Sequence, residues 1–262
     1  MLPEIPDEQL RQVLEAIARE VLREAEVARP PVDAFYVAER LGLIIARDRP
    51  VAEGVEQPRA RFVRLAAGNG LVPSAMSDRQ EGQGAILLAD DPRRERRQWA
   101  VAHEIGESRA YRVFNELGVD PRQAPPAARE EIANRLANSL LLPRDWFLRD
   151  GVSIDWDLFD LKAIYATASH ELIARRMLEM PPSVIVTVAD QGRCVWRRGN
   201  GLARTPPLTA PERAAWIAAH DGGQPAACDR SELPEGVDDV RAWPIHEPGW
   251  RREIIRTELT AW

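Results

Sequence analysis

The chain has 262 residues, of which 45% are hydrophobic and 29% charged, with a formal net charge of −6 at pH 7. This composition suits a globular protein of one large domain or two modest ones, and the acidic balance argues against broad, nonspecific nucleic-acid binding. We expect a cytoplasmic protein, because the start does not resemble a signal peptide, no apolar run could span a bilayer, and two cysteines make no disulfide framework.

The first 90 residues are predicted to form helices followed by strands. Apolar residues recur at helical spacing over residues 6–28, and a second short helix is expected over residues 32–41, with Gly42 as its end. Compact or alternating apolar runs predict strands over residues 43–46, 60–65 and 84–89. The intervening residues 66–83 are expected to form a loop.

The next helix contains the most informative stretch of the chain. Asp90-Asp91-Pro92 is typical of a helix start, and the helix is expected to run to about Leu117. Within it, residues 98–107 read Gln-Trp-Ala-Val-Ala-His-Glu-Ile-Gly-Glu, a zinc-peptidase HExxH pattern that ends in glutamate. Residues four apart share one helix face, so His103 and Glu107 can both reach one metal ion. Glu104 stands where such sites place the general base.

A catalytic zinc site typically needs three protein ligands, and the third is expected from the following helix. That helix is predicted to begin near Ala127 and to end at Pro143. Glu130 and Glu131 both lie in its first turn. We prefer Glu130, because it shares a face with residues that favour close packing against the motif helix: Ala133, Asn134 and Ala137.

The glutamate at position 107 changes the expected chemistry of the site. Two carboxylates and one imidazole neutralise the charge of a divalent ion, so a water at that ion is acidified less. Zn²⁺ is the expected ion. Because carboxylates favour harder ions, Mn²⁺ and Fe²⁺ are alternatives. A further alternative is that Glu107 pairs with an arginine and no metal binds. The remaining histidines are isolated in sequence and are expected to be structural or solvent-exposed: His170, His220 and His246.

Past Gly151 the chain is predicted to continue with further helices before its character changes at Pro181. Two short helices, over residues 155–165 and 169–180, have helix-turn-helix proportions. Arg175 and Arg176 suggest a DNA-facing edge, but the packing face of Leu172, Ile173 and Met177 favours a structural helical hairpin. After Pro181, strand hairpins are expected over residues 183–197 and 240–259, with a helix over residues 211–220.

We therefore predict an α+β fold with three parts. Residues 1–150 form a zincin-like metallopeptidase domain with a small sheet and the motif helices. Residues 151–181 form a helix-turn-helix-like segment, and residues 182–262 a small α+β domain. The last part is consistent with a sensor or docking module and equally with a structural cap.

Several segments together resemble the ImmA/IrrE family of metallopeptidases. Residues 96–106 are close to that family's AHE(L/I)GH segment, residues 130–137 resemble its ExxANxFA helix, and residues 140–143 resemble its LLMP ending. The resemblance extends over about residues 30–180. It implies His103 and Glu130 as zinc ligands and Glu104 as general base, while the family's second histidine falls on Glu107.

The resemblance implies a metal-dependent endopeptidase that acts on a protein substrate, such as a transcriptional repressor, in a regulatory or stress response. The strand over residues 84–89 would pair with the substrate backbone as an edge strand. The alternative is a catalytically impaired relative that binds a regulatory protein in the same groove. Neither a membrane nor a directly bound nucleic acid is an expected partner.

Overall fold

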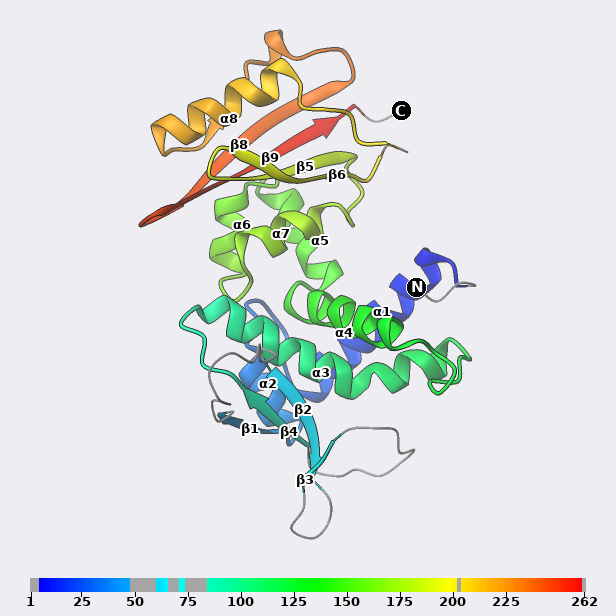
Figure 1. Cartoon of the computed structure of the whole chain (residues 1–262). Helices are drawn as coiled ribbons and strands as arrows, with labels where there is room; N and C mark the ends of the chain where they lie inside the picture. The colour runs from blue at the N-terminus through cyan, green and yellow to red at the C-terminus, as the bar shows by residue number, and fades with distance from the viewer. Residues whose placement is uncertain (1–4, 48–59, 66–70, 74–83, 202–203, 261–262) are drawn as a thin grey trace. The chain divides into compact units, whose positions relative to one another are not determined.

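Figure 1 shows the computed structural model, which describes residues 5–47, 60–65, 71–73, 84–201 and 204–260. The described chain combines helices with two β-sheets, which confirms the predicted α+β class. It divides into two compact units, the first made of residues 1–150 and 164–169 and the second of residues 151–163 and 170–262. Within the described residues, no helix is long and apolar enough to cross a membrane.

The first unit contains the helices that frame the motif: α1 (Asp7–Glu24), α2 (Ala34–Arg40), α3 (Arg94–Glu116) and α4 (Pro126–Leu141). The face of α1 that holds Leu14, Ile17 and Val21 is buried, as their helical spacing predicted. The helix α3 begins at Arg94, two residues later than the Asp91-Pro92 start signal, because the Asp91 carboxylate accepts a hydrogen bond from the Arg93 N–H before the helix opens.

A buried glutamine ties α3 to the start of α2. The Gln98 side chain accepts a hydrogen bond from the Ala34 N–H at 2.7 Å and donates one to Asp33 Oδ1 at 3.0 Å. Asp33 is the N-cap of α2 and also accepts from the Phe35 N–H. The polar atoms of Gln98 are therefore satisfied within the core, and the turn of α3 just before the motif is held in place.

The sheet of the first unit has the strand order β1-β4-β2-β3: β1 (Ile44–Arg47), β2 (Ala60–Leu65), β3 (Leu71–Pro73) and β4 (Gly84–Leu88). The strand β4 pairs in parallel with β1 and antiparallel with β2. The prediction that this strand is an edge open to a substrate is therefore wrong, because both of its sides are already hydrogen-bonded. The strand β3 lies within the predicted loop, most of which is outside the described residues.

The helices α3 and α4 pack closely at a glycine. A Cβ atom built on Gly106 would lie 2.7 Å from the Ala133 carbonyl oxygen and 3.2 Å from Leu136 Cβ. Ala133 and Ala137 are fully buried on α4. The small residues predicted to allow a close approach of the two helices are thus at their contact, which sets the distance between the side chains of α3 and those of α4.

Three short helices follow in the chain: α5 (Arg144–Ser153), α6 (Leu158–Ile164) and α7 (His170–Met177). The last two correspond to the predicted helical pair, with shorter limits. Between them, residues 164–169 belong to the first unit, where the Thr167 hydroxyl donates a hydrogen bond to the Val32 carbonyl at 2.7 Å.

The second unit contains an antiparallel sheet of order β6-β5-β9-β8-β7, covered in part by α8. Its elements are β5 (Val184–Asp190), β6 (Arg193–Gly199), α8 (Ala210–Gly222), β7 (Ala226–Ala227), a 3₁₀ turn (Arg230–Glu232), β8 (Val237–Glu247) and β9 (Trp250–Leu259). Both predicted hairpins are present, β5–β6 and β8–β9. The apolar contact between helix and sheet is made by Ala215, Ala219, Val240, Ala242 and Ile255.

Candidate metal centre

The helix α3 brings three metal-binding side chains together. One ligand atom from each of His103, Glu104 and Glu107 lies within 4.8 Å of the other two. His103 and Glu107 share a face because they are four residues apart, and Glu104 is the neighbour of His103 on the inner side of the helix. Glu104 is 3% exposed, whereas His103 and Glu107 are partly exposed, so the group opens toward solvent on one side only.

Glu130 approaches this group from α4. Its Oε2 lies 3.7 Å from His103 Nε2, and its side chain is 66% exposed. Glu131, the alternative third ligand, lies 3.8 Å from Arg135 in an ion pair along α4. Of the two glutamates, Glu130 is therefore the one that the structure places beside His103.

Asn134 connects the two helices at the site. Its Oδ1 lies 3.1 Å from His103 Nδ1, and its Nδ2 donates a hydrogen bond to Glu130 Oε1 at 3.3 Å. When His103 carries its proton on Nδ1 and donates it to Asn134, the Nε2 lone pair is available to an ion on the side of Glu130. Asn134 was predicted only to lie on the packing face of its helix. Its spacing of four residues from Glu130 was the signal for this positioning role.

The carboxyl group of Glu104 is the most perturbed acid of the site. Its pKa is raised to about 8, chiefly by burial, then by the negative charge of Glu107 and, to a smaller extent, by that of Glu130. A hydrogen bond from the backbone N–H of Phe62 in β2 opposes these effects. In the described part of the chain, Glu104 Oε2 is buried without a hydrogen-bond partner. Burying a polar atom without a partner costs folding free energy. Groups of this kind are therefore often found at functional sites.

These observations test whether the residues suit a divalent ion. An unpartnered buried carboxylate oxygen stands beside an imidazole whose other nitrogen is held by an amide, which is the usual arrangement around a metal ligand. No arginine among the described residues forms an ion pair with Glu107, so the alternative of an Arg–Glu107 pair has no support there. The donor set of one imidazole and several carboxylates fits a divalent cation.

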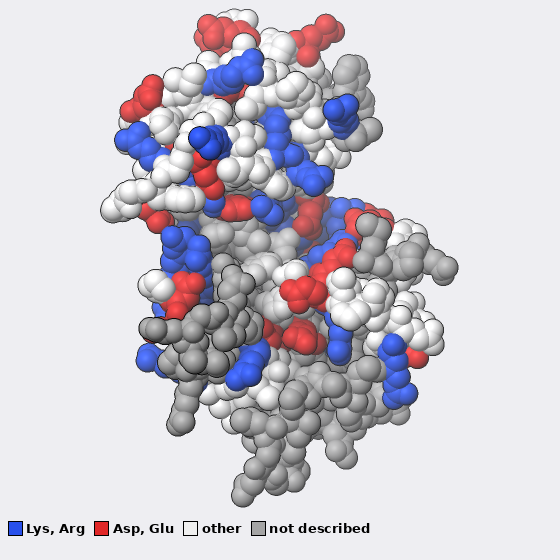
Figure 2. Space-filling model, in the orientation of Figure 1, with Lys and Arg blue, Asp and Glu red and all other residues white. Residues whose placement is uncertain are grey.

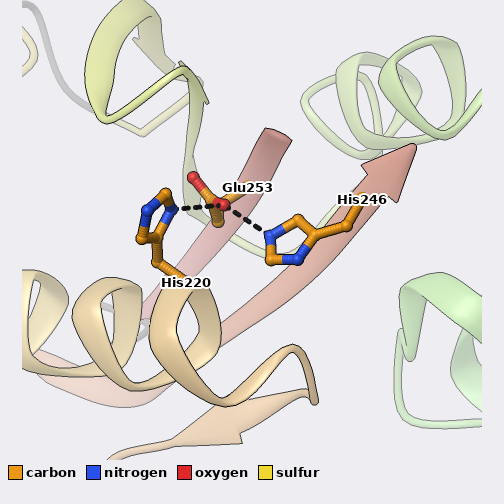
Figure 3. Close-up of side chains that lie close together, drawn as sticks. All are labelled: His220, His246 and Glu253. Atoms are coloured by element: carbon orange, nitrogen blue, oxygen red, sulfur yellow. Dashed lines mark hydrogen bonds and ion pairs between the residues drawn. The ribbon is translucent and has the colours of Figure 1, made fainter. Parts of the chain in front are cut away.

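A second group of possible ligands lies in the other unit, where none was predicted. His220, His246 and Glu253 meet at one carboxylate (Figure 3). The two histidines were expected to be isolated because they are 26 residues apart in sequence. The packing of α8 on the β8–β9 hairpin brings them together. His170 instead contacts the Phe159 ring at 5.8 Å between centroids, in keeping with its predicted structural role.

No family model and no curated protein matches this chain. Among solved structures, the chain is similar to a Mycobacterium tuberculosis transcriptional regulator, with a TM-score of 0.60 and 13% sequence identity. The similarity covers 98% of this chain and 81% of that chain. At this identity the likeness shows a shared fold and nothing about activity.

Proposed function

We propose that the chain is a metal-dependent endopeptidase that acts on a protein substrate. His103, Glu107 and Glu130 would hold a divalent ion, Zn²⁺ in the first instance, and Glu104 would act as general base. One observation carries the proposal: Glu104 presents a buried, unpartnered carboxylate oxygen within a few ångströms of an imidazole that Asn134 orients.

When bound, a divalent ion would supply Lewis acidity to the scissile carbonyl and to the attacking water. The residues of the chain supply the rest. Glu104 in its ionised form can accept a proton at Oε2 and return it to the leaving amine, and its raised pKa makes its carboxylate a stronger base. Asn134 holds the His103 ring and the Glu130 carboxylate in one arrangement. The close contact of α3 and α4 at Gly106 keeps the two helices at the distance that this arrangement needs.

The substrate class is proposed as a regulatory protein, on the strength of the resemblance to the ImmA/IrrE family. Because β4 is paired on both sides, a substrate strand cannot add there. The outer strands of this sheet are β1 and β3, and an extended substrate segment would have to add to one of them.

Proteolysis by paired variants tests the proposal. The purified chain, supplied with Zn²⁺ or Mn²⁺, is incubated with a peptide library, and the cleavage products are identified by mass spectrometry. We expect Glu104→Gln to lower the rate by roughly 100-fold or more, because general acid–base catalysis is lost. Glu131→Gln is the matched control on α4 and should leave the rate unchanged. A chain that binds neither ion, or a Glu104→Gln variant as active as the parent, would sink the proposal.

A second candidate, a catalytically impaired relative that binds a regulatory protein, is favoured by one specific residue. Glu107 adds negative charge where two imidazoles and one carboxylate would leave the ion net positive. We expect Glu107→His to raise the rate of peptide cleavage if this glutamate is a disabling change. If the parent chain is active and Glu107→His lowers its rate, Glu107 binds the ion in an active enzyme. That result would exclude the hypothesis of a catalytically impaired relative.

A further inference from the structure

In the second unit, three side chains from three elements converge on a single oxygen atom. His220 lies in the last turn of α8, His246 near the end of β8 and Glu253 in β9 (Figure 3). His220 Nδ1 is 2.9 Å and His246 Nε2 is 2.8 Å from Glu253 Oε1. The other carboxylate oxygen, Oε2, accepts a hydrogen bond from Trp216 Nε1 at 2.9 Å.

The fold brings these residues together through strand register and helix spacing. In the β8–β9 hairpin, Glu253 pairs with Pro244, so His246, two residues further along β8, lies diagonally opposite on the same face. On α8, Trp216 and His220 are four residues apart and therefore share one face. Both of them contact the Glu253 carboxylate, which fixes its orientation from the side of the helix.

The charge of Glu253 is balanced differently from that of the other buried glutamate in this unit. Both Glu253 and Glu212 are 0% exposed. The carboxylate of Glu212 pairs with Arg197 at 2.9 and 3.0 Å. Glu253 forms no ion pair with an arginine or lysine among the described residues; it faces two imidazoles. A positive charge stabilises a buried carboxylate beyond its hydrogen bonds, and a cation bound by the three side chains would supply that charge.

The geometry also suits a metal ion. The ligand atoms of the three residues lie within 4.8 Å of one another. A tetrahedral Zn²⁺ with bonds of about 2.0–2.2 Å separates its ligand atoms by roughly 3.3–3.6 Å, so each ring nitrogen would move away from Glu253 Oε1 by roughly 0.4–0.8 Å. The His220 and His246 side chains are 28% and 24% exposed, which leaves one side of the group accessible to an ion and to a further ligand. A cavity of about 510 Å³ borders His246 on the side of the β8–β9 turn.

We propose that His220, His246 and Glu253 form a binding site for a divalent transition-metal ion, with Zn²⁺ as the preferred ion. Two imidazoles and one carboxylate are borderline donors that select Zn²⁺ over Mg²⁺ or Ca²⁺. Three protein ligands leave a fourth position open to water or to a small ligand. The ion joins the C-terminal turn of α8 to the β8–β9 hairpin, and it binds independently of the group on α3.

The test uses the full chain with His103→Ala, which removes the only imidazole of the group on α3. Metal binding is followed by calorimetry with Zn²⁺ and by visible absorbance with Co²⁺. We expect one equivalent of ion to bind and the melting temperature to rise. Adding His220→Ala or His246→Ala should weaken binding by roughly 100-fold or more, and each metal-free variant should keep its circular dichroism spectrum. His170→Ala, which changes the remaining histidine, is the matched control and should bind as tightly as the background chain.

A second measurement keeps the proposal testable if a ligand variant fails to fold. In the folded His103→Ala chain, nitrogen-edited NMR of the three remaining histidine rings reports which of them meet the ion. Zn²⁺ should shift the ring signals of His220 and His246 and leave those of His170 in place. Absence of saturable binding, or equal binding by the His246→Ala variant, would overturn the site. Because His103 is absent throughout, failure here is separate from failure of the peptidase proposal.

Discussion

At the scale of single residues, the two candidate sites differ in the hydrogen bonding of a buried glutamate. Glu104 keeps one carboxylate oxygen without a partner and has a pKa raised to about 8. Glu253 is equally deep, yet both of its oxygens accept hydrogen bonds from Trp216 and two imidazoles. The Glu104 carboxylate therefore has an oxygen without a hydrogen bond, and the Glu253 carboxylate does not.

The raised pKa of Glu104 predicts a pH-dependent stability of the metal-free chain. The folded state holds this proton up to about pH 8, whereas an unfolded glutamate releases it near its ordinary value of 4.5. Folding therefore gains stability from this group below about pH 4.5, and the gain is lost as the pH rises toward 8. In the presence of a chelator, we expect Glu104→Gln to be more stable than the parent at pH 8, by on the order of a few kcal/mol relative to pH 5.

Urea denaturation of both proteins at the two pH values measures this difference. Its control is Glu131→Gln, whose stability relative to the parent should change little between pH 5 and 8. A Glu104→Gln variant with the same relative stability at both pH values would show that Glu104 is not the group responsible.

At the scale of secondary-structure elements, the contact between α3 and α4 determines the geometry of the first site. His103 and Glu107 come from one helix, and Glu130 and Asn134 come from the other. The distance of 3.7 Å between His103 Nε2 and Glu130 Oε2 therefore depends on how closely the helices approach. Gly106 permits that approach, because its backbone meets the Ala133 carbonyl where a side chain would clash.

We expect Gly106→Ala to destabilise the chain by about 1–3 kcal/mol, because the added Cβ meets a backbone oxygen at 2.7 Å and that oxygen cannot move alone. Helix propensity by itself favours alanine over glycine by about 1 kcal/mol. A net loss in the free energy of unfolding would therefore indicate the close contact between the two helices. Gly222→Ala, at the end of α8 with no atom within 4 Å of its added Cβ, is the control and should be neutral or slightly stabilising. Thermal or urea unfolding measures the stability of both variants. A Gly106→Ala chain that is more stable than the parent would contradict the close packing of α3 and α4.

At the scale of the whole molecule, the distribution of charge bears on whether the chain binds nucleic acid. Figure 2 shows basic and acidic side chains interspersed on the face that it presents. The two arginines that suggested a DNA-facing edge are already engaged within the second unit. Arg175 pairs with Glu171 at 2.6 Å and stacks over the Trp196 ring at 4.5 Å, and Arg176 is 1% exposed and pairs with Glu179.

We therefore expect no saturable binding of duplex DNA at about 150 mM salt, as measured by electrophoretic mobility shift. Arg175 and Arg176, the two residues that suggested phosphate contacts, are each paired with a neighbouring carboxylate. A shift that saturates and that Arg175→Ala abolishes would show that α7 does contact DNA.

The sequence by itself determined the local features of this protein: the helices that carry His103 and Glu130, and the two C-terminal hairpins. These follow from spacings of four residues in helices and two in strands, which a single segment contains. Only the tertiary structure decided that β4 is an inner strand, that Glu104 is buried against Phe62, and that His220 and His246 meet at Glu253. Each of these features depends on which distant segments pair. Strand order and helix packing are determined by the burial of the whole core, and a pattern within one short segment does not contain that information.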